Sequence, residues 1–183
     1  MKEAPESQSP DRLTGLLTRV YRDEMHSVES LSIAVRYFSR FPGPALSFAR
    51  CSADGARHVA VVASRLVELT GKVTSVPGRS AALERMPGFK SDERGDLEDL
   101  VRFVSRVYAD GQRAMVAYQT VAESIGADVA SMKIFRRLAQ DEQAHVGSFE
   151  QIILWLADQG YMDSIRAAFA EDGVEGSCLH STE

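Results

Sequence analysis

Cysteine is scarce in this sequence: its 183 residues include two, Cys51 and Cys178, which lie far apart. No C-x-x-C pair is present, so the sequence provides neither a disulfide framework nor a cysteine site for zinc or for iron of the rubredoxin type. Any chemistry in this chain must therefore rest on other side chains.

An excess of positive charge and an apolar leader are also lacking. The net charge is -5 with no basic tract to offset it, which disfavours a nucleic-acid backbone as the main partner. The stretch Met1–Pro10 is polar and has no apolar segment of the kind that directs secretion or membrane insertion. We therefore expect a cytoplasmic protein without nucleic-acid or membrane partners.

Strand-like alternation is absent as well, and helical periodicity accounts for nearly the whole chain. The sequence predicts an all-α fold, an antiparallel four-helix bundle over residues 11–170, with long helices at about 11–40, 44–70, 95–124 and 128–158 and a short C-terminal helix at 161–170. Glycine and proline punctuate residues 71–94, which suits a long crossover between the second and third helices. Residues 1–10 are expected to form a disordered N-terminal arm, and residues 171–183 a flexible C-terminal tail.

Charged side chains interrupt the apolar seam of the predicted fourth helix. Positions three and four residues apart run Phe135, Leu138, Glu142, His145, Phe149, Ile152 and Leu156. A carboxylate and an imidazole in a buried seam are costly unless they are paired or bound to a cation. Glu-x-x-His is the unit with which four-helix bundles hold iron or manganese pairs. The other predicted long helices carry similar interruptions at Glu24, His58 and Asp110.

The two predicted hairpins repeat each other. Phe48–His58 aligns without a gap with Phe135–His145, so that Asp54 matches Asp141 and the two histidines match. Gly55 stands where the second hairpin has Glu142, so the first hairpin lacks one carboxylate. Packed face to face, the hairpins would bring together Glu24, His58, Asp110, Glu142 and His145.

The order carboxylate, Glu-x-x-His, carboxylate, Glu-x-x-His on antiparallel helices resembles the ferritin-like superfamily, particularly its rubrerythrin-like and di-iron carboxylate hydroxylase branches. The resemblance covers about residues 12–158 and implies a non-haem iron site with the ligands Glu24, His58, Asp110, Glu142 and His145. Gly55 departs from the pattern, which leaves di-iron, mono-iron and variant centres open, and manganese suits the same ligand types. The altered position indicates either an open coordination position or a site that has decayed.

Other side chains are predicted to support the site. Asp54 and Asp141 each precede a histidine by one helical turn, and we interpret them as hydrogen-bond acceptors for the imidazoles. Tyr21 and Tyr118 lie near the seams, either beside the metal or as core packing. Glu29 is a reserve ligand.

The resemblance implies an oxidoreductase that activates dioxygen or peroxide to oxidise a small organic substrate. Without rubredoxin-type cysteines, electrons would come from an external reductase or from the substrate itself. A ferroxidase or iron-binding protein is one alternative, and a non-catalytic interaction or assembly module is another. We expect a homodimer formed through an exposed helix face, whereas a storage cage would be far larger.

Overall fold

The computed structural model describes residues 10–72, 95–126 and 128–172, and these residues form helices. The helices are α1 (Pro10–Tyr37), α2 (Pro42–Thr70), α3 (Leu97–Ser124), α4 (Val129–Asp158) and α5 (Met162–Glu171). The predicted all-α bundle with a short C-terminal helix is confirmed. The predicted arm apart from Pro10, most of the predicted crossover and nearly all of the predicted tail fall in residues 1–9, 73–94 and 173–183, outside the described residues. Pro10 begins α1, so the first helix starts inside the predicted arm.

The helix ends follow local chemistry. Asp96 caps α3 in a reciprocal pair with Asp99, and the Asp128 side chain accepts the backbone N–H of Ser131 at the start of α4. Gly71 ends α2 in the left-handed region at φ 67°, where glycine has no steric penalty. The first helix ends earlier than predicted and α2 begins at Pro42, because proline is well suited to a first-turn position.

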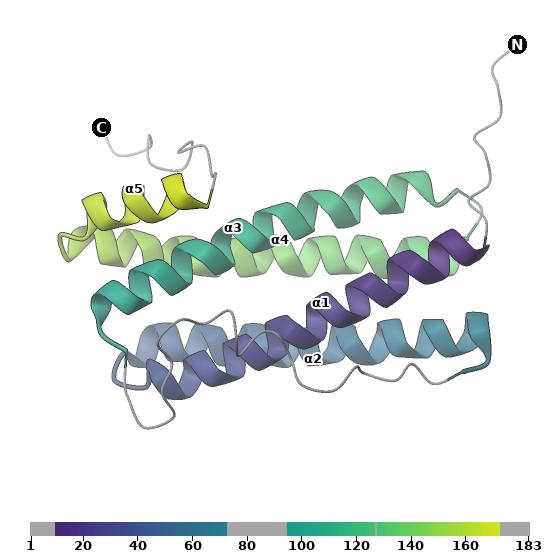
Figure 1. Ribbon diagram of the computed structural model, residues 1–183, viewed down its shortest axis with the longest axis horizontal. Helices are drawn as coiled ribbons and strands as arrows, with labels where there is room; N and C mark the ends of the chain where they lie inside the picture. The colour runs from purple at the N-terminus through teal and green to yellow at the C-terminus, as the bar shows by residue number, and fades with distance from the viewer. Residues whose placement is uncertain (1–9, 73–94, 127, 173–183) are drawn as a thin grey trace, which may run out of the picture.

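Two hairpins build the bundle (Figure 1). Helix α1 packs on α2, α3 packs on α4, and α2 meets α4 across the middle, while α5 covers the end of the second hairpin. Helices α2 and α3 run in the same direction. Within the described part of the chain, no helix combines the length and apolar character that a membrane span requires.

A polar layer divides the apolar core into two clusters. One cluster lies toward α5 and includes Phe38, Phe48, Phe103, Phe149 and Leu156. The other lies toward the opposite end and includes Leu17, Tyr21, Leu66, Tyr118 and Phe135. Between them lie three buried ionisable side chains: Glu24 at 4% exposure, His58 at 5% and His145 at 7%. Such groups are rarely buried without partners, which directs attention to this layer.

Candidate metal centre

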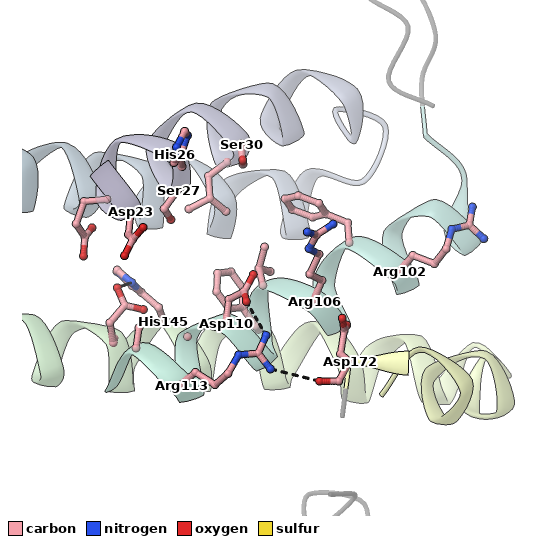
Figure 2. Close-up of a pocket in the computed structure, with 18 of the residues that line it drawn as sticks. Asp23, His26, Ser27, Ser30, Arg102, Arg106, Asp110, Arg113, His145 and Asp172 are labelled. Carbon is pink, nitrogen blue, oxygen red and sulfur yellow. Dashed lines mark hydrogen bonds and ion pairs between the residues drawn. The ribbon is translucent and has the colours of Figure 1, made fainter. Parts of the chain in front are cut away.

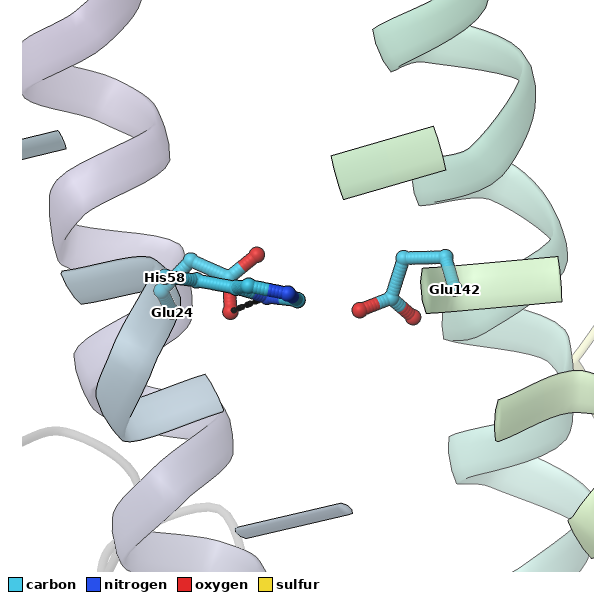
Figure 3. A group of neighbouring side chains, drawn as sticks. All are labelled: Glu24, His58 and Glu142. Carbon is cyan, nitrogen blue, oxygen red and sulfur yellow. Dashed lines mark hydrogen bonds and ion pairs between the residues drawn. The ribbon is translucent and has the colours of Figure 1, made fainter. Parts of the chain in front are cut away.

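Three side chains from different helices meet in the polar layer. Glu24 of α1, His58 of α2 and Glu142 of α4 each offer one ligand atom, and these atoms all lie within 4.8 Å of one another. Figure 3 shows Glu24 and His58 extending from the first hairpin toward Glu142 on the second. Among the described residues, this is the one group of at least three His, Cys, Asp or Glu side chains with that geometry.

Glu24 is held by two donors inside the bundle. The Tyr118 hydroxyl donates to Glu24 Oε1 at 2.9 Å, and His58 Nδ1 lies 3.2 Å from Glu24 Oε2. Burial and the adjacent Glu24 charge raise the pKa of Tyr118, so the phenol keeps its proton and remains a donor. Both predicted tyrosines belong to the apolar cluster around Leu17, and Tyr118 is the one whose hydroxyl donates to Glu24.

His58 lies between two carboxylates. Its Nε2 is 3.1 Å from Asp141 Oδ2, on the side of the ring opposite to Glu24. Burial alone would lower the pKa of His58, but the hydrogen bonds and charges of Glu24 and Asp141 outweigh it, and the pKa is raised. Burial would raise the pKa of Asp141, yet bonds from His58 and Arg137 lower it. In the metal-free protein, these bonds favour a protonated His58 imidazole next to an ionised Asp141.

The supporting aspartates act across the hairpins. Asp54 Oδ2 lies 3.2 Å from Nε2 of His145, on the other hairpin, and also pairs with Arg57. Asp141 reaches in the opposite direction to His58 and accepts a 2.9 Å bond from Arg137 Nε. Both aspartates are thus hydrogen-bonded to imidazoles, but each serves the histidine of the opposite hairpin. Docking of the two hairpins is therefore required for the Nε2 contact of either ring.

His145 lies beside the three-residue group but outside it. Its Nδ1 is 3.3 Å from Glu142 Oε1, and its ring centroid is 6.1 Å from that of His58. With one ring nitrogen on Glu142 and the other on Asp54, His145 is positioned to orient Glu142.

Asp110, by contrast, does not join the group. Its side chain is 61% exposed and pairs with Arg113. The buried residue is its neighbour Gly111, which precedes His145 by the same 34 residues that separate Glu24 from His58. Adjacent helix positions point about 100° apart, so a carboxylate one residue off the seam faces outward. The expectation that Asp110 joins the other four residues in the bundle interior is therefore wrong.

The space at Gly55 is occupied. A Cβ at this position would lie 2.9 Å from Val28 Cγ2 and 3.6 Å from Glu24 Oε2. The glycine lets α1 and the Glu24 carboxylate lie against the backbone of α2. Val28 and the first hairpin's own glutamate therefore occupy the space beside Gly55, where the sequence left an open coordination position as one of two interpretations. Glu29, the reserve ligand, is half-buried and lies outside the group.

Cys51 also lies near this layer without joining the group. Burial, together with the charge of Glu142, raises the pKa of the Cys51 thiol to about 12. The thiol form is therefore the one present in the metal-free protein at neutral pH.

A groove between α1 and α3 leads to the polar layer. Its volume is about 680 Å³, and its walls include Glu142 and His145 at one end. Leu31, Phe103 and Val107 provide apolar surface along it. Figure 2 shows Ser27 and Ser30 on the α1 side and Arg106 extending from α3. Sequence reasoning missed this groove because its width depends on the separation of two helices that belong to different hairpins.

Comparison with solved structures places this arrangement among known folds. The chain superimposes on a dodecameric thioferritin, the bacterioferritin-related protein from Bacteroides fragilis, with a TM-score of 0.65, over 84% of this chain and 91% of that one. The fold is ferritin-like. The two sequences are 16% identical, so the likeness concerns the fold. No protein-family model and no curated protein sequence matches the ferritin-like chain.

Proposed function

We propose that this ferritin-like protein binds iron between its two hairpins and oxidises Fe(II) with dioxygen or peroxide. The observation that carries the proposal is the convergence of Glu24, His58 and Glu142 within 4.8 Å in the polar layer of the core. The solved relative is a thioferritin, which is consistent with iron as the metal. Bound Fe(II) would be the electron donor, and dioxygen or peroxide would be the electron acceptor.

The donor set fits such an ion. Two carboxylates and one imidazole are oxygen and nitrogen donors suited to Fe(II) or Mn(II). In the metal-free protein the charge of Glu24 is balanced by a proton on His58 and by the Tyr118 hydroxyl. A divalent cation would take over that compensation and release the His58 proton, because a metal-bound histidine must be neutral.

The surrounding residues hold this set in place. Tyr118 fixes Glu24, Asp141 fixes the ring of His58, and His145 contacts Glu142. The two apolar clusters flank the layer on either side along the bundle. The chain thus provides a pre-organised polar site in an apolar surrounding, which strengthens its electrostatic interactions.

The test is an anaerobic Fe(II) titration of the metal-free protein, followed by exposure to dioxygen. We expect at least about half an equivalent of bound iron per chain and oxidation faster than that of free Fe(II). Glu142→Gln and His58→Ala should abolish both, whereas Glu123→Gln on the exposed surface of α3 should change neither. Wild-type protein that takes up less iron, with no effect of the two site variants, would leave the non-catalytic assembly module as the remaining candidate.

The groove favours a second candidate function, the oxidation of a small organic substrate. Its volume of about 680 Å³ and its apolar wall suit a small molecule lying next to Glu142 and His145. Ala117→Trp would obstruct this groove without altering the three-residue group. If the groove binds a substrate, this variant should lose substrate-stimulated dioxygen consumption and retain Fe(II) oxidation. Equal loss or equal retention of both would contradict the organic-substrate candidate.

We also propose that the protein forms a homodimer through the outer face of α2. Three large apolar side chains are exposed there: Leu46 at 53%, Val61 at 49% and Val67 at 40%. Exposed apolar surface on a protein can serve as a contact surface between copies. Light scattering separates a dimer from a cage such as the dodecamer of the thioferritin.

A further inference from the structure

Each of the two hairpins contributes one glutamate and one histidine to the polar layer, but the hairpins place them on different helices. The first provides a glutamate on its first helix, Glu24, and a histidine on its second. The second hairpin provides both Glu142 and His145 on its second helix. Glycine occupies the matching position in each case: Gly55 of the first hairpin aligns with Glu142 of the second, and Gly111 of the second hairpin aligns with Glu24 of the first. Each hairpin therefore supplies one glutamate and one histidine.

Both glycines are covered by the glutamate of their own hairpin. A Cβ on Gly111 would lie 3.5 Å from Glu142 Oε2 and 3.1 Å from Val146 Cγ2. Gly55 stands in the same relation to Glu24 Oε2, at 3.6 Å. The space that a carboxylate at position 55 of α2 or 111 of α3 would occupy is thus already filled. The apolar seams of the two hairpins therefore supply two carboxylates to the layer, Glu24 and Glu142.

The remaining donors do not complete a second metal position. His145 has a carboxylate at each ring nitrogen, Glu142 and Asp54, just as His58 has Glu24 and Asp141. What separates the two histidines is position, because His145 falls outside the group of mutually close ligand atoms. Asp54 is also paired with Arg57. A second metal ion would have His145 as its own ligand and would otherwise share glutamates with the first ion. A single ion, by contrast, can contact all three residues of the group.

On the basis of the iron-binding function proposed above, we propose that the site holds a single metal ion per chain, with Glu24, His58 and Glu142 as its ligands. His145 is then a positioning residue that holds Glu142 through its Nδ1. This assignment makes the two histidines unequal although the hairpins that carry them repeat each other in sequence. That inequality gives the inference its test.

The test uses Mn(II), which reports its own nuclearity by electron paramagnetic resonance. Equilibrium dialysis of metal-free protein should give one Mn(II) per chain, with the hyperfine pattern of an isolated ion. His58→Ala should weaken the affinity more than about 100-fold, beyond the usual effect of an outer partner, and His145→Ala should weaken it about 10- to 100-fold while one ion still binds. His145→Gln keeps an amide donor near Glu142 and should recover part of the loss.

Circular dichroism shows whether each variant remains helical, and Glu123→Gln serves as the surface control. Two Mn(II) ions per chain with an exchange-coupled spectrum, reduced to one by His145→Ala, would overturn the single-ion inference and leave iron binding intact. An absence of bound Mn(II) and Fe(II) in wild-type protein would overturn the proposed function together with this inference. An equal loss of affinity in the two histidine variants, with no recovery in His145→Gln, would refute the positioning role.

Discussion

Removal of the Tyr118 hydroxyl tests how the polar layer is held together. In Tyr118→Phe, the Glu24 carboxylate loses a 2.9 Å hydrogen bond between two buried side chains, which are 7% exposed for Tyr118 and 4% exposed for Glu24. A hydrogen bond to a charged group contributes about 1.5–3 kcal/mol to stability. For a domain of this size, each kcal/mol changes the melting temperature by about 2–4 °C. We therefore expect a decrease of about 3–12 °C in the metal-free protein.

Differential scanning calorimetry of the metal-free protein measures this change. Tyr161→Phe is the matched control, because Tyr161 is half-buried and its hydroxyl has no hydrogen-bond partner among the described residues. The control should stay within about 0.5 kcal/mol of the wild type. If Tyr118→Phe were equally neutral, Glu24 would not depend on the phenol, and the account of a pre-organised carboxylate would be refuted.

Other variants test the cap of α4, the close packing at Gly55 and the assembly face. Burial by itself would raise the pKa of the Asp128 carboxylate, but hydrogen bonds from α4 and from an arginine of α2 outweigh burial and lower that pKa. The stabilisation that Asp128 contributes is therefore present above pH 3.8 and is lost as the pH falls through the folded-state pKa. In urea unfolding, Asp128→Ala should lose about 1–2 kcal/mol at pH 7 and flatten this acid dependence. Gly55→Ala should lose about 1–3 kcal/mol because its Cβ meets Val28 at 2.9 Å, whereas Gly147→Ala, with nothing within 4 Å, should gain up to about 1 kcal/mol. If the proposed dimer forms through α2, Val61→Glu should have the mass of a monomer in light scattering.

Each of these variants has an outcome that contradicts its premise. An unchanged acid limb in Asp128→Ala would mean that the cap does not set the low-pH stability. Equal responses of the two glycine variants would contradict close packing at Gly55. A Val61→Glu protein with the mass of the wild type would place any interface elsewhere.

The helical periodicity of the sequence predicted the bundle and three members of the metal-candidate group. Glu24, His58 and Glu142 were found because each continues an apolar seam, and a helix places every third or fourth residue on one face. Asp110 was chosen wrongly because it was the carboxylate nearest the expected level of α3. Its position one residue from Gly111 rotates it into solvent, a difference that a loosely drawn seam does not resolve.

Local sequence determined where helices begin, which faces are apolar and that polar groups interrupt those faces, because these properties depend on residues a few positions apart. The tertiary structure alone decided that Asp54 pairs with His145 and Asp141 with His58, since each pair joins different hairpins. It also decided that side chains of α1, including Glu24, occupy the space beside Gly55 and that a groove opens between α1 and α3. These features depend on the rotation and separation of packed helices, which the periodicity of a single helix does not specify.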